Sequence, residues 1–246
     1  MPYPRIAAVL LFALAARASA QTEGVAEFKG SINAGQGRMI QTSGKIYFVK
    51  GVAYRSEWET DMTALMKSRS MPQTFPARYR TIAIQKLSDP DRMITLDEQR
   101  RSYRIIDLKN LREDAPAASS KAYTVKRLGR DSVAGLACEK ALVTSSDETR
   151  SDLCVATDLI PSSAWIEAQG RREGSNDLMK ALREAGLGGF PIHLVTHSRG
   201  ESQAAYSLEL VRLEARPVPA AVFEVPPGYV EAKDPSEEIL RRSRGR

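Results

Sequence analysis

The sequence is poor in the residues that bind metals and carry redox chemistry. It holds two cysteines and two histidines among 246 residues. A tetrahedral zinc site takes four ligands, which here would need both thiols together with His193 and His197, and no Cys-x-x-Cys pair is present. A glycine-rich phosphate loop is also missing, because Gly186, Gly188 and Gly189 follow an expected helix and do not open one. We therefore expect no metal and no cofactor.

The sequence also lacks an apolar run of the about 20 residues that a membrane-spanning helix needs. The run 6–16 is shorter, follows Arg5 and precedes the small-residue triplet 18–20. This arrangement is typical of a secretory signal peptide, here residues 1–20, cleaved before Gln21. Since no cysteine follows the cleavage site, we expect no lipid anchor. We expect a soluble protein exported to the periplasm, with no transmembrane segment.

The body of the chain has no excess of basic residues. The formal net charge is +6, but two arginines lie in the expected signal peptide and four more in the last six residues. A nucleic-acid binder needs basic residues massed on one surface, so we expect no nucleic-acid partner. We expect the basic tail, residues 231–246, to be disordered, with peripheral contact to an anionic membrane as the alternative.

The two cysteines, Cys138 and Cys154, predict a disulfide, because an even count in an oxidising compartment favours pairing. Their positions are symmetrical about Ser146. A hairpin that turns there would place them opposite each other on neighbouring strands.

β-branched and aromatic residues alternate with polar ones through most of the chain, which predicts strands and hairpins. These segments are 44–58, with its turn at Lys50-Gly51, then 81–108, 123–125, 138–154, 192–196 and 206–213. Two helical segments interrupt them. One is a short turn that carries Trp165, and the other, between Ser175 and Gly186, places Leu178 and Leu182 on one face. With no regular βαβ alternation, this order predicts an α+β domain in which helices cover one face of a curved antiparallel sheet.

Residues 61–77 lack alternation and contain Met62, Met66 and Met71. We expect a long loop with one helical turn that acts as a lid or a partner loop, since methionine offers an adaptable apolar surface. Thioethers also bind Cu(I), which is the less favoured alternative.

The segment 196–200 resembles the Gly-x-Ser-x-Gly elbow of serine hydrolases around Ser198, but its first glycine is missing. Both histidines precede Ser198, whereas the order of triad residues on that fold places the histidine after the serine. We predict a hairpin turn at this segment, and a protein that is not an enzyme.

Four short motifs are similar to those of one bacterial family. They are the hairpin 44–57, the strand pair 93–108, the hairpin that opens with Gly135-Leu136-Ala137-Cys138 and ends at 155–159, and the closing Phe223-Glu224-Val225-Pro226-Pro227-Gly228-Tyr229. Together they resemble an exported bacterial family known only as a domain of unknown function, related to the periplasmic outer-membrane lipoprotein carriers with the LolA-like fold. The resemblance implies one domain, 21–230, folded as an unclosed antiparallel β-barrel with helices on its concave side.

The resemblance also implies a hydrophobic cavity between sheet and helices, in which an apolar lining shelters an acyl chain. Its candidate lining consists of apolar residues from the expected strands and helices: Ile46, Phe48, Tyr54, Trp58, Ile82, Ile84, Trp165, Leu178 and Leu182. The same residues equally suit a filled core.

Two hypotheses of function follow. The first is a non-enzymatic periplasmic binding protein for a hydrophobic or amphipathic ligand, such as a lipid or an acylated chain. The alternative is a protein-interaction or envelope-stress module that uses the fold as a scaffold and presents its methionine-rich loop or a sheet edge to an envelope protein.

Overall fold

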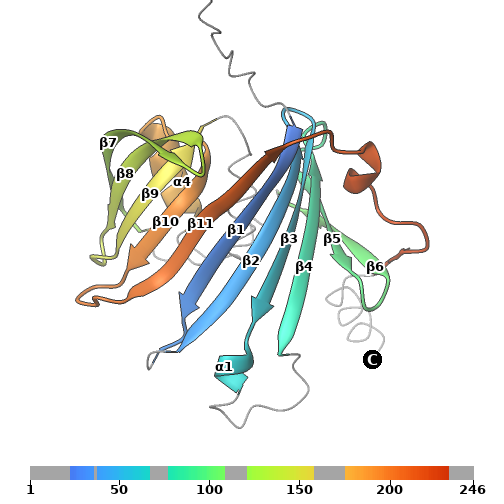
Figure 1. Ribbon diagram of the computed structural model, residues 1–246, viewed down its shortest axis with the longest axis horizontal. Coiled ribbons are helices and arrows are strands. Elements are labelled where there is room, and N and C mark those ends of the chain that lie inside the picture. The colour runs from blue at the N-terminus through green and yellow to red at the C-terminus, as the bar shows by residue number, and fades with distance from the viewer. Residues whose placement is uncertain (1–22, 36–37, 67–76, 109–120, 158–174, 233–246) are drawn as a thin grey trace, which may run out of the picture.

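The structure is a computed structural model that describes residues 23–35, 38–66, 77–108, 121–157 and 175–232. In this part of the chain, twelve strands form one sheet, accompanied by three short helical segments (Figure 1). The predicted signal peptide, residues 1–20, lies outside the described residues, as does residue 233 onward of the predicted tail.

No helix among the described residues is long and apolar enough to cross a membrane.

The twelve strands occur along the whole described part of the chain. Their bounds are β1 (Glu23–Asn33), β2 (Met39–Val49), β3 (Ala53–Asp61), β4 (Arg78–Lys86), β5 (Arg92–Asp97), β6 (Ser102–Asp107), β7 (Tyr123–Val133), β8 (Leu136–Ser145), β9 (Arg150–Ala156), β10 (Phe190–His197), β11 (Ala204–Ala215) and β12 (Val230–Glu231). The helical segments are α1 (Thr63–Met66), α4 (Ser175–Glu184) and the 3-10 turn η1 (Ala220–Phe223).

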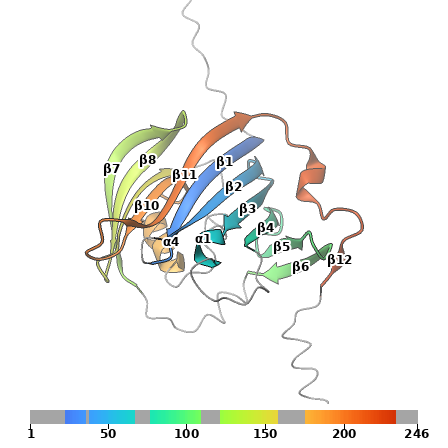
Figure 2. The ribbon, with the colours of Figure 1, turned by 60° about the horizontal axis from the view of Figure 1, so that its bottom comes forward.

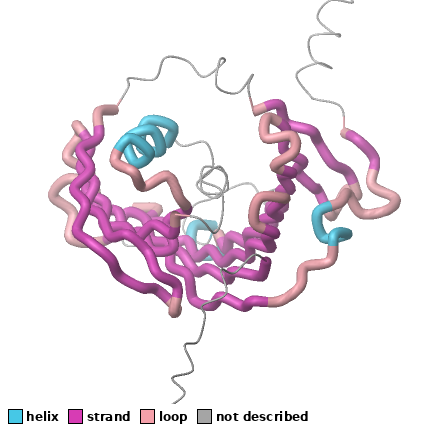
Figure 3. Tube along the Cα trace, turned by 90° about the horizontal axis from the view of Figure 1, so that it is seen from above, coloured by secondary structure: helices cyan, strands magenta, loops and turns pink. Residues whose placement is uncertain are grey.

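The strands pair in the order β12-β6-β5-β4-β3-β2-β1-β11-β10-β9-β8-β7. Every neighbouring pair is antiparallel except β12 and β6, which run parallel. The two end strands, β7 and β12, do not pair with each other, and the sheet curls into an open trough (Figures 2 and 3). The predicted curved, unclosed antiparallel sheet is confirmed.

The predicted hairpins are observed with their turns. β2 and β3 meet at Lys50-Gly51, where Gly51 has a φ of +73°, a conformation that glycine adopts without steric cost. The meander β4-β5-β6 and the late hairpin β10-β11 also occur where the alternation indicates them. β1 was not predicted, although it lies between β2 and β11 in the middle of the sheet.

The concave face of the trough holds the larger apolar cluster. On β2 and β3, Ile46 pairs with Ser56 and Phe48 with Tyr54, so these four side chains share this face. We call the buried apolar residues around them the concave cluster. It includes Ala26, Phe28, Ile46, Phe48, Tyr54, Trp58, Ala141, Leu153, Leu182, Phe190, Leu194 and Leu208.

Helix α4 lies inside the trough (Figure 3), where Met179 and Leu182 join the concave cluster. The sequence predicts two helical segments over this face. Among the described residues, α4 is the one helix of more than a single turn. The predicted turn around Trp165 lies outside them.

The convex face is covered over β3 and β4 by residues 216–232, which we call the C-terminal strap. Phe223 of η1 is buried there against Ile82 and Ile84 of β4 and Ala53 of β3, in a separate convex cluster. The strap continues to the sheet edge, where Val230 donates its N–H to the carbonyl of Arg101 at 3.0 Å and β12 pairs with β6. The strap was not predicted.

The residues of the closing motif hold this strap in place. Tyr229 packs on the convex cluster, and its N–H donates to the carbonyl of Pro226 at 3.3 Å. Gly228 has a φ of +80°, and a Cβ there would lie 2.9 Å from a guanidinium nitrogen of Arg101. The motif therefore serves the packing of the convex side.

Candidate functional site

A row of three aromatic rings crosses the concave face. Phe190 of β10 lies 5.3 Å from Phe28 of β1, and Phe28 lies 5.9 Å from Trp58 of β3, measured between ring centroids. Gly44 of β2 makes room for this row. A Cβ at Gly44 would lie 2.3 to 2.6 Å from three atoms of the six-membered ring of Trp58. The indole therefore lies directly on the backbone of β2.

Strand β3 brings polar groups into this apolar face. Tyr54, Ser56, Trp58 and Thr60 alternate along it, and all four are buried. The Tyr54 hydroxyl donates to Oε1 of Gln85 at 2.5 Å, and Nε2 of Gln85 donates to a backbone carbonyl in the turn before β5 at 2.6 Å. Pairing of this kind is what buried polar groups require, because a buried group without a partner destabilises the fold.

The indole N–H of Trp58 departs from this pattern. The residue is 7% exposed, and among the described residues its Nε1 is the one buried side-chain nitrogen or oxygen without a hydrogen-bond partner. Leaving such a donor unpaired costs on the order of 1–3 kcal/mol. Within the described part of the chain, the concave face thus presents one buried donor that has no acceptor.

Helix α4 is fixed over the face by its ends as well as by its apolar side. At its C-terminal end, Leu187 donates its N–H to the carbonyl of Leu182 at 2.7 Å, and Gly186 donates to that of Arg183 at 2.9 Å. With a φ of +75° at Gly186, this is the Schellman ending, and it confirms the predicted helix stop.

At its N-terminal end, α4 is joined to the turn between β8 and β9 through Lys121. The Lys121 N–H donates to a carboxylate oxygen of Asp177 at 3.1 Å, and its ammonium lies 2.8 Å from the carboxylate of Asp147. The Lys121 ammonium and the hydroxyl of Ser145 hold the pKa of Asp147 well below its ordinary value. This network ties the helix to the β7–β9 arm of the trough.

The structure separates the predicted cavity residues. Ile46, Phe48, Tyr54, Trp58 and Leu182 belong to the concave cluster, and Leu178 packs against it. Ile82 and Ile84 lie on the convex side, because they pair with Glu57 and Arg55 on the opposite face of β3. Trp165 lies outside the described residues. That these residues line a ligand cavity stays a prediction.

Three residues of the aromatic row and its surroundings were not identified from the sequence. Phe28 lies in the unpredicted strand β1, Phe190 begins β10 after two glycines, and Gly44 stands inside β2. A glycine within a strand pattern is a signal of close approach by another group, and at Gly44 this signal was present in the sequence.

The methionine-rich loop begins as predicted with one helical turn. Met62 accepts a backbone hydrogen bond from Met66 and donates its own N–H to the carbonyl of Ala77 at 2.7 Å, which closes the base of the loop. Met62 and Met66 are both partly exposed. Met71 lies outside the described residues, and a role as lid or partner loop stays a prediction.

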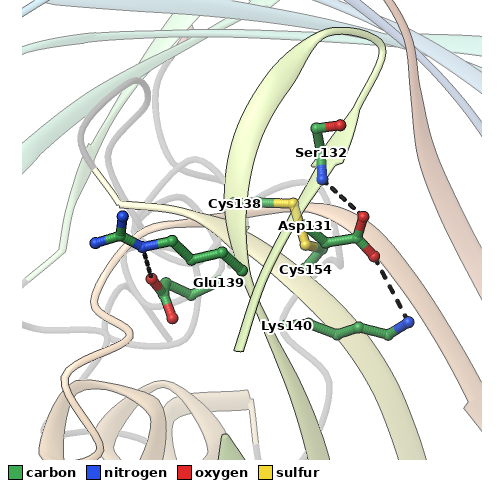
Figure 4. The surroundings of a disulfide bond; sticks show 7 residues. Asp131, Ser132, Cys138, Glu139, Lys140 and Cys154 are labelled. Carbon is green, nitrogen blue, oxygen red and sulfur yellow. Dashed lines mark hydrogen bonds and ion pairs between the residues drawn. A yellow bond between two sulfur atoms is a disulfide. The ribbon is translucent and has the colours of Figure 1, made fainter. Parts of the chain in front are cut away.

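Cys138 and Cys154 form the predicted disulfide, with Cα atoms 5.5 Å apart (Figure 4). They are not directly opposite, as the symmetry about Ser146 would require. Cys154 pairs with Lys140, so the two cysteines are diagonal neighbours on β8 and β9. The reason is the turn, which is centred on Asp147. Its Glu148 has a φ of +64°, and Ser145 and Thr149 close it by a backbone hydrogen bond of 2.9 Å.

The segment around Ser198 is the predicted hairpin turn between β10 and β11. The carbonyl of Ser198 accepts the N–H of Glu201 at 3.1 Å, and Gly200 has a φ of +71°. Ser198 lines a shallow polar hollow of about 450 Å³ together with His197 and five charged residues. Two of these, Arg199 and Glu148, form an ion pair at 3.0 Å across it.

Within the described part of the chain, no three His, Cys, Asp or Glu side chains gather in a group that could hold a metal ion.

Comparison with known proteins yields one family. The model of a domain of unknown function, DUF4412, matches residues 28–229. A search of curated proteins finds no match.

A search of solved structures finds matches of low sequence identity. An uncharacterized conserved protein from Thermus thermophilus matches with a TM-score of 0.44 and 9% identity, over 87% of this chain and 92% of that one. A LolA superfamily protein from Nitrosomonas europaea matches with a TM-score of 0.33 and 9% identity, over 83% and 91%. The Pseudomonas aeruginosa MucA/MucB complex matches with a TM-score of 0.37 and 13% identity, over 84% of this chain and 56% of that one. The chain thus spans little more than half of this last relative.

Proposed function

Because the chain belongs to the family of domains of unknown function DUF4412, we propose a function from the geometry itself: a non-enzymatic binding protein that holds the hydrocarbon of a lipid or acylated chain against the concave face. The site is the concave cluster with its aromatic row, and among the described residues α4 is the helix that packs on it, through Met179 and Leu182. In keeping with the signal-like residues 1–20, we propose that the protein is exported and acts in the periplasm.

The observation that carries the proposal is a large apolar face inside a sheet that does not close. The concave cluster extends over β1, β2, β3, β8, β9, β10 and β11, whereas α4 contributes two fully buried side chains to it, Met179 and Leu182. An acyl chain placed on such a face gains about 0.8 kcal/mol for each CH₂ group removed from water.

The open edges supply a way for the site to admit a ligand. In a closed barrel, strand number and stagger fix the interior volume. Here β7 and β12 are the two end strands of the sheet as described, and they do not pair with each other. No hydrogen bonds between these two strands therefore oppose a widening of the trough. We infer that an acyl chain enters by displacing α4 from the concave cluster while the sheet stays intact.

The test is a titration of residues 21–246 with a fluorescent fatty-acyl probe, preceded by native mass spectrometry and organic extraction of the protein purified from a periplasm. We expect a co-purified lipid or saturable probe binding. Two matched variants locate the site. Ala26→Leu adds bulk to the concave cluster, and Ala53→Leu adds the same bulk to the convex cluster. Probe affinity should fall in the first variant and persist in the second.

Equal loss of affinity in both variants, or a protein that neither carries lipid nor binds any acyl probe, would contradict the proposal. The latter result would instead favour the protein-interaction alternative, with Met62 and Met66 as the first residues to substitute.

A further inference from the structure

We propose that the indole N–H of Trp58 is the polar contact of this site, and that it selects an acyl ester whose uncharged carbonyl oxygen accepts its hydrogen bond. The inference rests on the proposed function and names its ligand class. A plain hydrocarbon, and an acyl chain that ends in a charged carboxylate, are the ligands it disfavours.

The first argument is the unpaired donor. Trp58 Nε1 is buried without an acceptor among the described residues, whereas the neighbouring Tyr54 hydroxyl on the same face has Gln85 as its partner. An indole nitrogen only donates, so its partner must bring an acceptor atom. A bound carbonyl oxygen would accept this hydrogen bond and remove the desolvation penalty of the buried N–H, which would strengthen binding.

The second argument is that the donor is held in place. Its six-membered ring lies over the backbone at Gly44, and Phe28 packs beside it at 5.9 Å. A ring fixed on both sides loses little further freedom when a ligand binds, which favours a specific contact over a passive apolar one.

The third argument is the absence of charge. The buried polar residues in the described part of the chain are serine, threonine and glutamine, and no lysine or arginine is among them. Burial of a carboxylate requires a charged or multiply hydrogen-bonded partner, and one indole N–H does not supply it. An ester carbonyl needs a single donor, which the Trp58 indole supplies.

The experiment compares two ligands of equal carbon number, methyl palmitate and heptadecane, delivered from cyclodextrin to protein labelled with ¹⁵N at its indoles. The chain has two tryptophans, so Trp165→Phe assigns the remaining indole signal to Trp58. We expect methyl palmitate to move the Trp58 indole proton downfield and heptadecane to leave it near its original position. This readout needs no substitution at Trp58 itself.

Affinity gives an independent measurement. Trp58→Phe keeps an aromatic ring and removes the donor, so it should weaken methyl palmitate about tenfold and change heptadecane binding by less than about twofold. Palmitate should bind the wild-type protein more weakly than its methyl ester above the pKa of the acid.

Three results separate the possible failures. If both ligands bind equally and the indole proton does not move, the role of Trp58 is refuted and the acyl-binding function stands. If palmitate binds more tightly than its ester, the uncharged-ester assignment is wrong. If neither chain binds any variant, the proposed function itself fails, and the inference fails with it.

Discussion

Substitution of Gly44 by alanine tests the packing on which the candidate site depends. The added Cβ would lie 2.3 Å from one ring atom of Trp58 and within 2.6 Å of two more, distances that real contacts do not show. The indole must therefore move, and Phe28, 5.9 Å away, limits where it can go. Overpacking of this kind costs about 1–3 kcal/mol. For a domain of this size, the midpoint of thermal unfolding should fall by about 2–12 °C.

A double-mutant cycle isolates this cause. Trp58→Phe removes Cε3 and Cζ3, the two ring atoms nearest the new methyl, so Gly44→Ala should cost less in that background than in the wild type. Urea unfolding of the wild type, the two single variants and the double variant gives the coupling energy. If the two effects add to within about 0.5 kcal/mol, the contact between Gly44 and Trp58 does not determine the packing, and the reasoning is refuted.

Three further predictions concern the elements around the site. Phe223→Ala should lower the free energy of unfolding by about 3 kcal/mol, because it empties the centre of the convex cluster. The control Val230→Ala, at a residue that is 66% exposed, should change it by less than about 0.5 kcal/mol. Urea unfolding compares the two variants, and equal effects would contradict a buried strap. The pKa of Asp147 is lowered in the folded state, so its carboxylate stabilises the fold above the ordinary value near pH 4 and loses this effect as the pH falls toward the folded value. Asp147→Asn should therefore be less stable than the wild type near pH 7, with the difference shrinking near pH 2, and a constant difference would rule out this source. Removal of the disulfide by Cys138→Ser and Cys154→Ser, with a sequence separation of 16, should cost about 3 kcal/mol, measured by unfolding without reductant. No loss of stability would show that the bridge does not restrain the unfolded chain.

Alternation and turn chemistry were sufficient to predict most of the sheet. The hairpin β2-β3 has its turn at Lys50-Gly51 because glycine accepts the φ of +73° found there. α4 ends before Gly186 for the same physical reason. Such local signals depend on a few neighbouring residues, and they can be recognised without knowledge of the fold.

β1 and the register of the cysteine hairpin depended on contacts that the sequence does not display. β1 contains Gly24 and Gly30, which weaken a strand pattern, and at Gly30 a Cβ would lie 2.6 Å from the backbone of β11. The cysteine hairpin turns around Asp147 and not Ser146, because Glu148 takes a left-handed conformation that a non-glycine residue adopts in few turns.

β4 shows why the candidate site could be predicted only in part. Ile82, Ala83, Ile84 and Gln85 are all buried in succession, since the concave cluster lies on one side of the strand and the strap on the other. Alternation assigns a face only when one side meets water, so the sequence could not tell that Ile82 and Ile84 point away from the trough. The strap is also where the closing motif acts, through Phe223, Gly228 and Tyr229.

The convex and concave faces of the sheet have different roles, and this difference bears on how the protein would select a ligand. Residues with a recognisable motif act on the convex side, where they fasten the strap to the sheet. On the concave side, as far as the structure describes the chain, apolar residues of ordinary strand composition surround one buried donor without an acceptor, the indole N–H of Trp58. The sequence does not reveal that this donor lacks an acceptor, because a tryptophan in a strand is also typical of a filled core. This becomes visible only when the position of every neighbouring acceptor is known. Discrimination between an ester and a hydrocarbon would thus depend on a single atom that strand patterns alone cannot identify.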